Sequence, residues 1–319
     1  MKSNLVSGLL LVVMLLGCSS RKIETEKSMN PVPGLSTYTE MRTGGVRDIF
    51  IHSPWNPERS LSLGFPEHCW GTGLPNTSHN SKEPTNSPWR FNADSTEGWY
   101  ENVPKPGVIY RARAISDSMA VRLSATIVNG TDEPITDIRS LVCLKPDSHK
   151  GALSRPEAMV GFRDTSFSRT WIAVDGSPML LGQETTYHGD IPDRGWAEHE
   201  IRSRINWGVN VEGGPDNRTL SSIGWFRGGS PGRIVEQVAG PPMIAVQDKD
   251  HADRWFTTIW KPSRVLFCNP QNPCFHSDPS FPDCPASDSI SVNGVVLFHQ
   301  GSIEGLVERV ENWRDSVTE

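Results

Sequence analysis

The feature that most constrains the fold is a segment in which apolar and polar residues alternate strictly. In residues 119–128 (MAVRLSATIV) the apolar positions all fall on one face: Met119, Val121, Leu123, Ala125 and Ile127. A period of two is typical of a half-buried β-strand. Residues 129–132 (NGTD) then suit a turn, and Ile135–Leu144 resumes the pattern, so the sequence predicts a β-hairpin here.

Similar short apolar runs recur along the chain and are separated by Gly and Pro. They predict further strands at Val108–Ile115, Thr170–Val174, Ile223–Phe226, Ile234–Val238, Met243–Val246, Trp255–Trp260, Arg264–Phe267 and Ser289–His299. No regular alternation of strands with helices is present, which argues against a parallel α/β fold. The prediction is an all-β fold, a large antiparallel β-sandwich with one C-terminal helix.

The predicted helix follows the last strand. Ser302 suits the N-cap, Glu304 is favourable in the first turn, and Ile303, Leu306, Val307, Val310 and Trp313 form one apolar stripe. We expect this stripe to pack across the open end of the sandwich.

The N-terminus predicts export and lipidation. An apolar run at Leu9–Leu16, too short to span a bilayer, follows a single lysine, as in a signal peptide. Residues 15–18 (LLGC) resemble the lipobox of bacterial lipoproteins, which implies cleavage before Cys18 and lipid attachment there; an ordinary signal peptide with a chance cysteine is the alternative. We therefore expect a signal peptide at 1–17, a lipidated tether at 18–40 and a single domain at 41–319, anchored through Cys18 at the bacterial cell envelope, facing the periplasm or on the outer-membrane surface.

Charge and motifs exclude several function classes. The net charge of −6 argues against a nucleic-acid partner. The sequence lacks the nucleophile elbow of serine hydrolases, the His-Glu-x-x-His pair of zinc proteases, the phosphate loop of ATPases and the dinucleotide fingerprint. A carboxylate pair of the glycosidase kind has no local signature and stays open.

Aromatic residues point to carbohydrate. Residues 54–104 have little periodicity and contain Trp55, Trp70, Trp89 and Trp99, which suit either stacking on sugar rings or packing in a core. We expect carbohydrate to be bound by a set of aromatic and basic side chains: Trp70, Trp260, Arg139 and His68.

The cysteines allow three interpretations. Without Cys18 the chain has an odd number of them, namely Cys69, Cys143, Cys268, Cys274 and Cys284. A disulfide among the last three fits an exported protein. Zinc held by Cys268, Cys274, His276 and Cys284 is the second interpretation, which would make the chain a Cys/His metalloprotein. Buried thiols are the third.

Two pairs of residues are candidates for catalysis. His276 and Asp278, two positions apart in an extended turn, suit an acid–base residue and the carboxylate that orients it; a purely structural turn is the alternative. Tyr187 and His188 suit a base and an acid in elimination from a sugar acid. No cofactor is indicated.

The C-terminal fifth of the chain carries a resemblance. Residues 274–279 (CFHSDP) and the ending VVLFHQGSIEGLVERV resemble exported bacterial proteins that we associate with sugar-active β-sandwiches, and the plan is similar to galactose-mutarotase-like supersandwiches. The catalytic His and Glu of the epimerases have no matching positions here. The resemblance implies an envelope lipoprotein that binds or processes carbohydrate as a lyase, epimerase or hydrolase; the alternatives are a non-catalytic glycan-binding or structural lipoprotein and the zinc protein.

Overall fold

The computed structural model describes residues 32–37, 48–78, 89–146, 157–188, 206–215, 232–269 and 274–317. All belong to the unit Pro31–Glu319. The predicted lipidation site Cys18 and the predicted strand Ile223–Phe226 lie outside the described residues. Among the described residues, no helix has the length and apolar character needed to cross a membrane.

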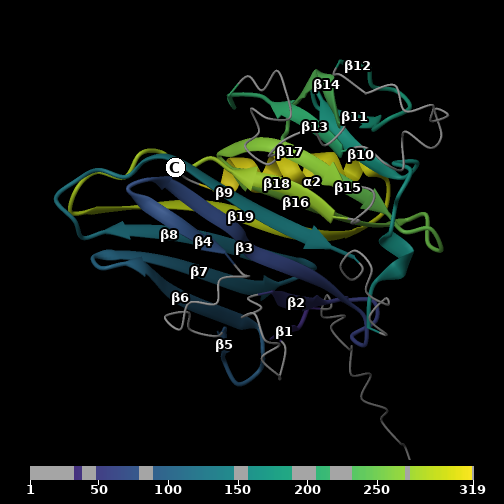
Figure 1. Cartoon of the computed structure of the whole chain (residues 1–319). Coiled ribbons are helices and arrows are strands. Elements are labelled where there is room, and N and C mark those ends of the chain that lie inside the picture. Colours follow the sequence, from purple (N-terminus) through teal and green to yellow (C-terminus); the bar gives the residue numbers. More distant parts are fainter. Residues whose placement is uncertain are drawn as a thin grey trace, which may run out of the picture. The chain divides into compact units, whose positions relative to one another are not determined.

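The first of two large sheets, called sheet A here, has ten strands (Figure 1). Their order is β1 (Leu35–Thr37), β2 (Ile49–His52), β3 (Ser60–Thr72), β9 (Thr136–Lys145), β18 (Cys274–Pro279), β17 (Ser263–Asn269), β13 (Asn206–Val211), β14 (Gly232–Ala239) and β12 (Tyr187–His188), with β4 (Leu74–Ser78) paired to β3. Neighbouring strands are antiparallel except for the parallel pair β13 and β14.

The second sheet, sheet B, has nine strands. Their order is β11 (Ser177–Leu180), β10 (Thr170–Val174), β15 (Ile244–Gln247), β16 (Arg254–Lys261), β19 (Asp288–Gln300), β8 (Ala120–Asn129), β7 (Val108–Asp117), β6 (Glu97–Lys105) and β5 (Arg90–Phe91). A short 3₁₀ helix, Val160–Phe162, precedes β10. The predicted all-β sandwich is confirmed.

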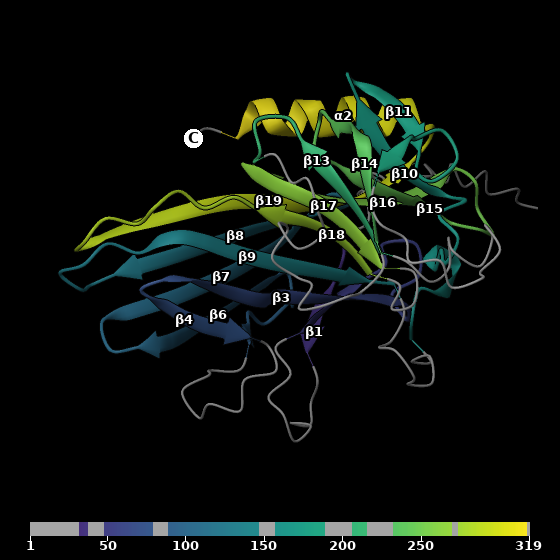
Figure 2. The same ribbon diagram turned by 45° about the horizontal axis from the view of Figure 1, so that its top comes forward.

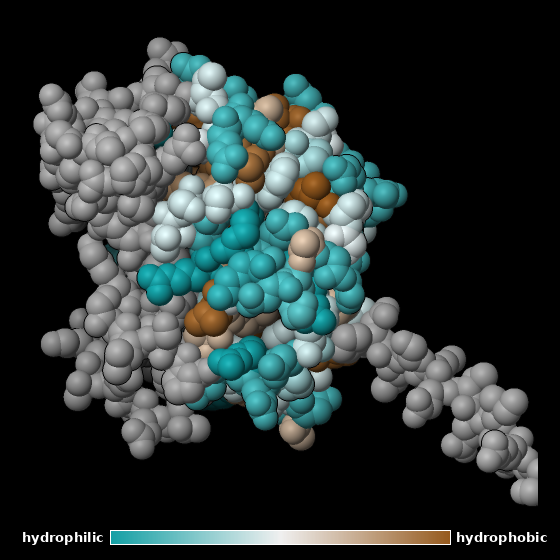
Figure 3. All heavy atoms as spheres, turned by 90° about the vertical axis from the view of Figure 1, so that its right-hand side faces the viewer, coloured by the Kyte–Doolittle hydropathy of each residue, from teal (hydrophilic) through white to brown (hydrophobic). Residues whose placement is uncertain are grey.

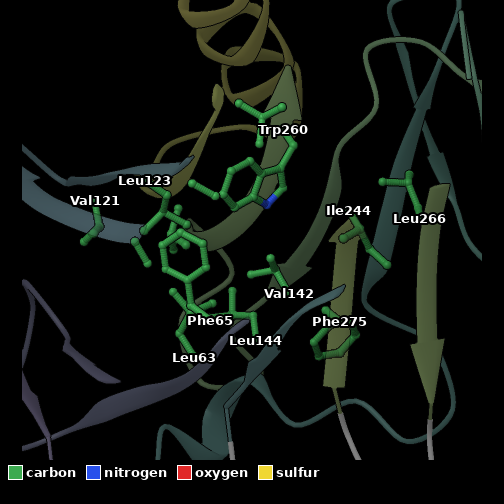
Figure 4. Packing of buried hydrophobic residues seen from close by; sticks show 14 of the residues in the cluster. Leu63, Phe65, Val121, Leu123, Val142, Leu144, Ile244, Trp260, Leu266 and Phe275 are labelled. Carbon is green, nitrogen blue, oxygen red and sulfur yellow. The ribbon is translucent and has the colours of Figure 1, made fainter. Parts of the chain in front are cut away.

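The main core fills the space between the sheets, as Figure 4 shows. Leu63, Val142 and Phe275 of sheet A face Leu123 and Trp260 of sheet B, and all are buried. Because successive side chains of a strand point to opposite faces, the residues between them lie on the other face of sheet A. We call this second face the outer face of sheet A.

The C-terminal helix is where the sequence predicts it. α2 (Ile303–Ser316) begins after Ser302, whose side chain accepts a hydrogen bond from the Gly305 N–H at 3.2 Å. The apolar stripe of α2 packs against Trp255, Ile259 and Val295 and forms with them a second core, on the face of sheet B that is turned away from sheet A. Figure 2 shows the helix beside β10 and β11. The expectation that it closes the open end of the sandwich is wrong, because β10, β15, β16 and β19 present an apolar outer surface that needs cover.

The large apolar side chains exposed in the described part are few and scattered: Val32, Trp99, Val103, Val160 and Val238. Figure 3 shows one face, on which hydrophilic residues predominate and hydrophobic ones form small separate patches. Such a distribution is ordinary for a protein surface.

Candidate functional site

The candidate site lies on the outer face of sheet A, where β3, β9 and β18 run side by side. Gly64 of β3 pairs with Cys143 of β9, and Cys143 pairs with His276 of β18. Residues directly opposite each other in an antiparallel pair share a face. The register therefore brings Cys143 and His276 together on the outer face, although 132 positions separate them in the sequence.

Five ionisable residues form a continuous line on this face, which we call the buried charge row. Lys145 Nζ lies 3.7 Å from Asp48 Oδ2 and 4.0 Å from Glu67 Oε1. Glu67 Oε2 lies 3.8 Å from His276 Nε2, and His276 Nδ1 lies 3.3 Å from Asp278 Oδ1. The row thus alternates in sign, with three carboxylates separated by an ammonium and an imidazole.

Exposure differs along the row and indicates which member meets solvent. The side chains of Lys145, His276 and Asp278 are only 1–2% exposed, whereas that of Glu67 is 13% exposed. Asp48 is 8% exposed, so Glu67 is the most exposed member of the row.

Burial and neighbouring charges shift the ionisation of the row. Burial opposes the charge of Lys145, but the neighbouring negative groups, Asp48 foremost with Cys143 and Glu67, together outweigh it, and the pKa of Lys145 is raised. Burial raises the pKa of Asp278, and His276 partly offsets this. Burial also lowers the pKa of His276, but the Cys143 sulfur and the Asp278 carboxylate together raise it well above its usual range.

Three soft ligands meet beside the row. One ligand atom each from Cys143, Cys274 and His276 lies within 4.8 Å of the other two, and all three residues are buried. Burial raises the pKa of the Cys143 thiol well above its ordinary value, and the adjacent Cys274 adds to the effect. Among the described residues this group has the composition of a metal site.

The structure does not show the disulfide expected among Cys268, Cys274 and Cys284, and it agrees with the alternative of buried thiols. All five described cysteines are buried and none is in a disulfide. Cys268 and Cys284 lie in the core between the sheets, whereas Cys274 lies on the outer face. The zinc set Cys268–Cys274–His276–Cys284 is therefore not assembled, because adjacent positions of paired strands alternate between faces.

His276 and Asp278 are brought together as predicted, but on a strand instead of an extended turn. In β18 they project from the same face, and Asp278 Oδ1 also accepts the backbone N–H of Val142 at 3.0 Å. His68, Trp70 and Arg139 lie on the same face: His68 pairs with Leu141, and Trp70 pairs with Arg139.

Arg139 lies at the Trp70 end of this face, and Arg264 is close enough to interact electrostatically with it. Arg139 is 27% exposed and donates from Nε to Asp137 Oδ1 at 3.3 Å. Burial, followed by the positive charge of Arg139, lowers the pKa of Arg264. The buried Nε of Arg264 makes no hydrogen bond with the described residues. Paired cations with donors to spare suit a carboxylate or sulfate.

The other predicted residues lie elsewhere. Trp260 is fully buried in the core, 5.5 Å from Phe65 between ring centroids, so it is not a stacking platform (Figure 4). Trp89 is likewise a core residue. β12, which carries Tyr187 and His188, is the edge strand of sheet A, four positions from β18 in the strand order. Standard spacing puts the two strands roughly 19 Å apart along the sheet.

Sequence reasoning missed Glu67 as a site residue, together with Cys143, Lys145 and Asp48. Glu67 stands next to the predicted His68, which is the one local signal that pointed to it. The other three come from β9 and the position before β2, and only the sheet register joins them to His276.

The described residues also line a pocket of about 230 Å³ at another place. Its lining includes Trp55, Arg59, Asp248, His251 and Arg254, and the Arg254 guanidinium lies 5.4 Å from the centre of the Trp55 ring. Of the residues singled out in the sequence, Trp55 lines it, one of the four tryptophans considered for stacking on sugar rings or packing in a core.

Comparison with known proteins gives structural likeness only. No family model and no curated protein sequence matches the chain. The Slr1438 protein of Synechocystis is 10% identical over 86% of this chain and 98% of its own, with a TM-score of 0.38. A galactose mutarotase-like protein of Clostridium acetobutylicum is 10% identical over 76% of this chain and 79% of its own, with a TM-score of 0.38. A galactose mutarotase related enzyme of Lactobacillus acidophilus is 9% identical over 83% of this chain and 98% of its own, with a TM-score of 0.36. The resemblance stated from the sequence agrees with these similarities.

Proposed function

We propose that the protein binds an acidic carbohydrate chain on the outer face of sheet A, between Trp70 and Glu67, and processes it at Glu67. The observation that carries this proposal is the pairing of Trp70 with Arg139 on the same face as the buried charge row, with Arg264 close enough to interact electrostatically with Arg139. An indole face packs on the apolar face of a pyranose, and guanidinium groups hold carboxylate or sulfate groups through paired hydrogen bonds.

The distance along sheet A between Trp70 and the buried charge row suits an oligosaccharide. Trp70 pairs with Arg139, and Gly64 pairs with Cys143 on the same two strands. Cys143 therefore lies four steps along β9 from Arg139, the partner of Trp70, and four steps of a strand extend over roughly 13 Å. Two linked pyranose rings extend over such a distance, so one ring lies on Trp70 while the next reaches Glu67.

His276 acts from behind Glu67 in this arrangement. Its side chain is 2% exposed against 13% for Glu67, so the sugar meets the carboxylate first. Lys145 and His276 contact opposite oxygens of Glu67 and hold it in place.

The experiment is titration calorimetry of the purified full-length protein with neutral, uronic acid and sulfated oligosaccharides. We expect binding of the acidic chains, weakened by salt because the contacts are ionic. Trp70→Ala and Arg139→Gln should weaken it at least about tenfold. Matched controls are Trp99→Ala and Arg113→Gln, a tryptophan and arginine paired in the same way on sheet B, which should leave binding unchanged. Equal losses in both sets, or no binding of any acidic chain, contradict the proposal.

Product masses from the same incubations identify the reaction. Fragments that sum to the substrate mass indicate a lyase, and fragments heavier by one water indicate a hydrolase. A product of equal mass with a changed NMR spectrum indicates an epimerase. Binding without any product supports the alternative of a non-catalytic glycan-binding protein.

We also propose that lipid on Cys18 holds the protein at the cell envelope. The support is the sequence of residues 1–18, with its short apolar run ending in Leu-Gly-Cys. Metabolic labelling with a fatty acid should mark the wild-type chain and spare Cys18→Ser, and labelling of both contradicts the assignment.

A further inference from the structure

The carbohydrate proposal uses His276 only to position Glu67 and gives no role to the two cysteines beside it, Cys143 and Cys274. The ligand atoms of this group of three lie within 4.8 Å of one another in a fully buried place. Tetrahedral zinc with bonds of 2.0–2.3 Å needs ligand atoms roughly 3.3–3.8 Å apart. The ligand atoms therefore have to approach one another by at most about 1.0–1.5 Å to bind the ion.

The surroundings of His276 match those of a histidine ligand. Metal-binding histidines usually donate their second ring N–H to a carboxylate, which fixes the tautomer and the ring orientation. Here Nδ1 lies 3.3 Å from Asp278 Oδ1, and the Val142 N–H holds the same oxygen at 3.0 Å. This leaves Nε2 to point towards the metal.

Zinc adds no net charge to this buried place when His276 is neutral. The ion replaces the thiol protons of Cys143 and Cys274, which pass to solvent, so two thiolates balance its two positive charges. Binding therefore does not leave an uncompensated charge buried next to the carboxylates of Asp48, Glu67 and Asp278.

Glu67 lies next to the group. Its Oε2 is 3.8 Å from His276 Nε2, and at 13% exposure it is the most exposed member of the row. Two cysteines and a histidine with a fourth, open position are a known ligand set of catalytic zinc. We propose that Cys143, Cys274 and His276 bind one zinc ion, with Glu67 facing its fourth coordination position. This goes beyond the carbohydrate proposal and does not depend on it.

The test is elemental analysis of the full-length protein, followed by chelation and reconstitution with Zn²⁺ or Co²⁺ alone. We expect about one zinc per chain. Cobalt should give the charge-transfer absorption of thiolate ligands and the intense visible bands of a tetrahedral site. Cys143→Ala, Cys274→Ala and His276→Ala should each lose most of the metal.

Cys69→Ala and Cys268→Ala are matched controls, because both remove a buried thiol that lies in the core between the sheets. They should keep full metal content and the cobalt spectrum. Asp278→Asn should keep the three ligands but weaken metal affinity about 10–100-fold, as a positioning residue does.

Three results overturn the proposal: a wild-type chain that takes up neither zinc nor cobalt, metal retained in Cys143→Ala or Cys274→Ala, or two fewer titratable thiols because these cysteines form a disulfide. The wild-type cobalt spectrum decides the matter even if a variant fails to fold. Because Trp70→Ala tests sugar binding without touching these ligands, failure of either proposal is seen separately.

Discussion

Lys145 is the group on which the buried charge row should depend most for stability. Its side chain is 2% exposed and lies 3.7 Å from Asp48 and 4.0 Å from Glu67. With an effective dielectric constant of 20, each of these attractions amounts to about 4 kcal/mol. Lys145→Met keeps most of the side-chain volume but leaves two carboxylates buried near each other without a cation.

Removing one partner of a buried ion pair typically costs 3–5 kcal/mol, which is the range we expect for Lys145→Met. For a chain of this size the melting temperature should fall by roughly 6–10 °C. Adding Asp48→Asn should recover part of the loss, since it removes one of the stranded charges. Thermal and denaturant unfolding of metal-free protein measure these changes without a contribution from bound ligand.

The matched control is Lys249→Met. Lys249 Nζ lies 3.9 Å from Asp250 Oδ2, a comparable distance, but the two side chains are 52% and 65% exposed. A surface pair of this kind contributes about 0–1 kcal/mol, so this variant should melt close to the wild type. Equal effects of Lys145→Met and Lys249→Met would refute the reasoning that burial of the row makes its lysine indispensable.

Three further predictions concern the fold. Gly294→Ala should cost about 1–3 kcal/mol in thermal unfolding, because a Cβ there would lie 2.6 Å from the indole of Trp260; an unchanged melting temperature contradicts this contact. Ser302→Ala should lower stability by about 1 kcal/mol through loss of the helix N-cap, whereas Ser302→Asp should retain it. Burial and the charge of Arg309 lower the pKa of His299, so the unfolded chain takes up the proton first as pH falls below about 6.5. Stability should therefore decrease from pH 7.5 to 5, and less so in His299→Gln; equal decreases in both proteins count against this.

Sequence patterns predicted the strands that have one apolar and one polar face. The alternation at 119–128 became β8, which pairs with β7 and with the long strand β19 in sheet B. The predicted hairpin between this strand and Ile135–Leu144 is wrong, because the second strand, β9, crosses to sheet A and pairs there with β3 and β18. α2 begins after its predicted cap. In these elements the local sequence is enough to predict the structure, because one face of each strand or helix packs on the core and the other face is polar.

Two of the three strands that build the candidate site, β3 and β18, were missed for a physical reason, whereas β9 was predicted as Ile135–Leu144. The first seven residues of β3 and all six of β18 are buried on both faces. A strand covered on both sides does not alternate between apolar and polar residues. A search for alternation therefore does not identify it as a strand. The three metal-ligand candidates come from β9 and β18, and contact between them depends on strand order, which local sequence does not encode.

Glu67 shows how the fold and the site depend on the same irregularity. In β3, Leu61, Leu63, Phe65 and Cys69 face the core, so strict alternation would send Glu67 there too. Between the pairs Gly64–Cys143 and His68–Leu141, however, four steps of β3 oppose two of β9. A bulge of this kind turns a side chain towards the opposite face, and it places the Glu67 carboxylate between Lys145 and His276 on the outer face. The bulge inserts two extra residues, an even number, so the alternation of faces beyond it is unchanged. Trp70 therefore lies on the outer face as well. One interruption of pairing therefore delivers both the carboxylate at the centre of the row and the ring proposed to hold the sugar.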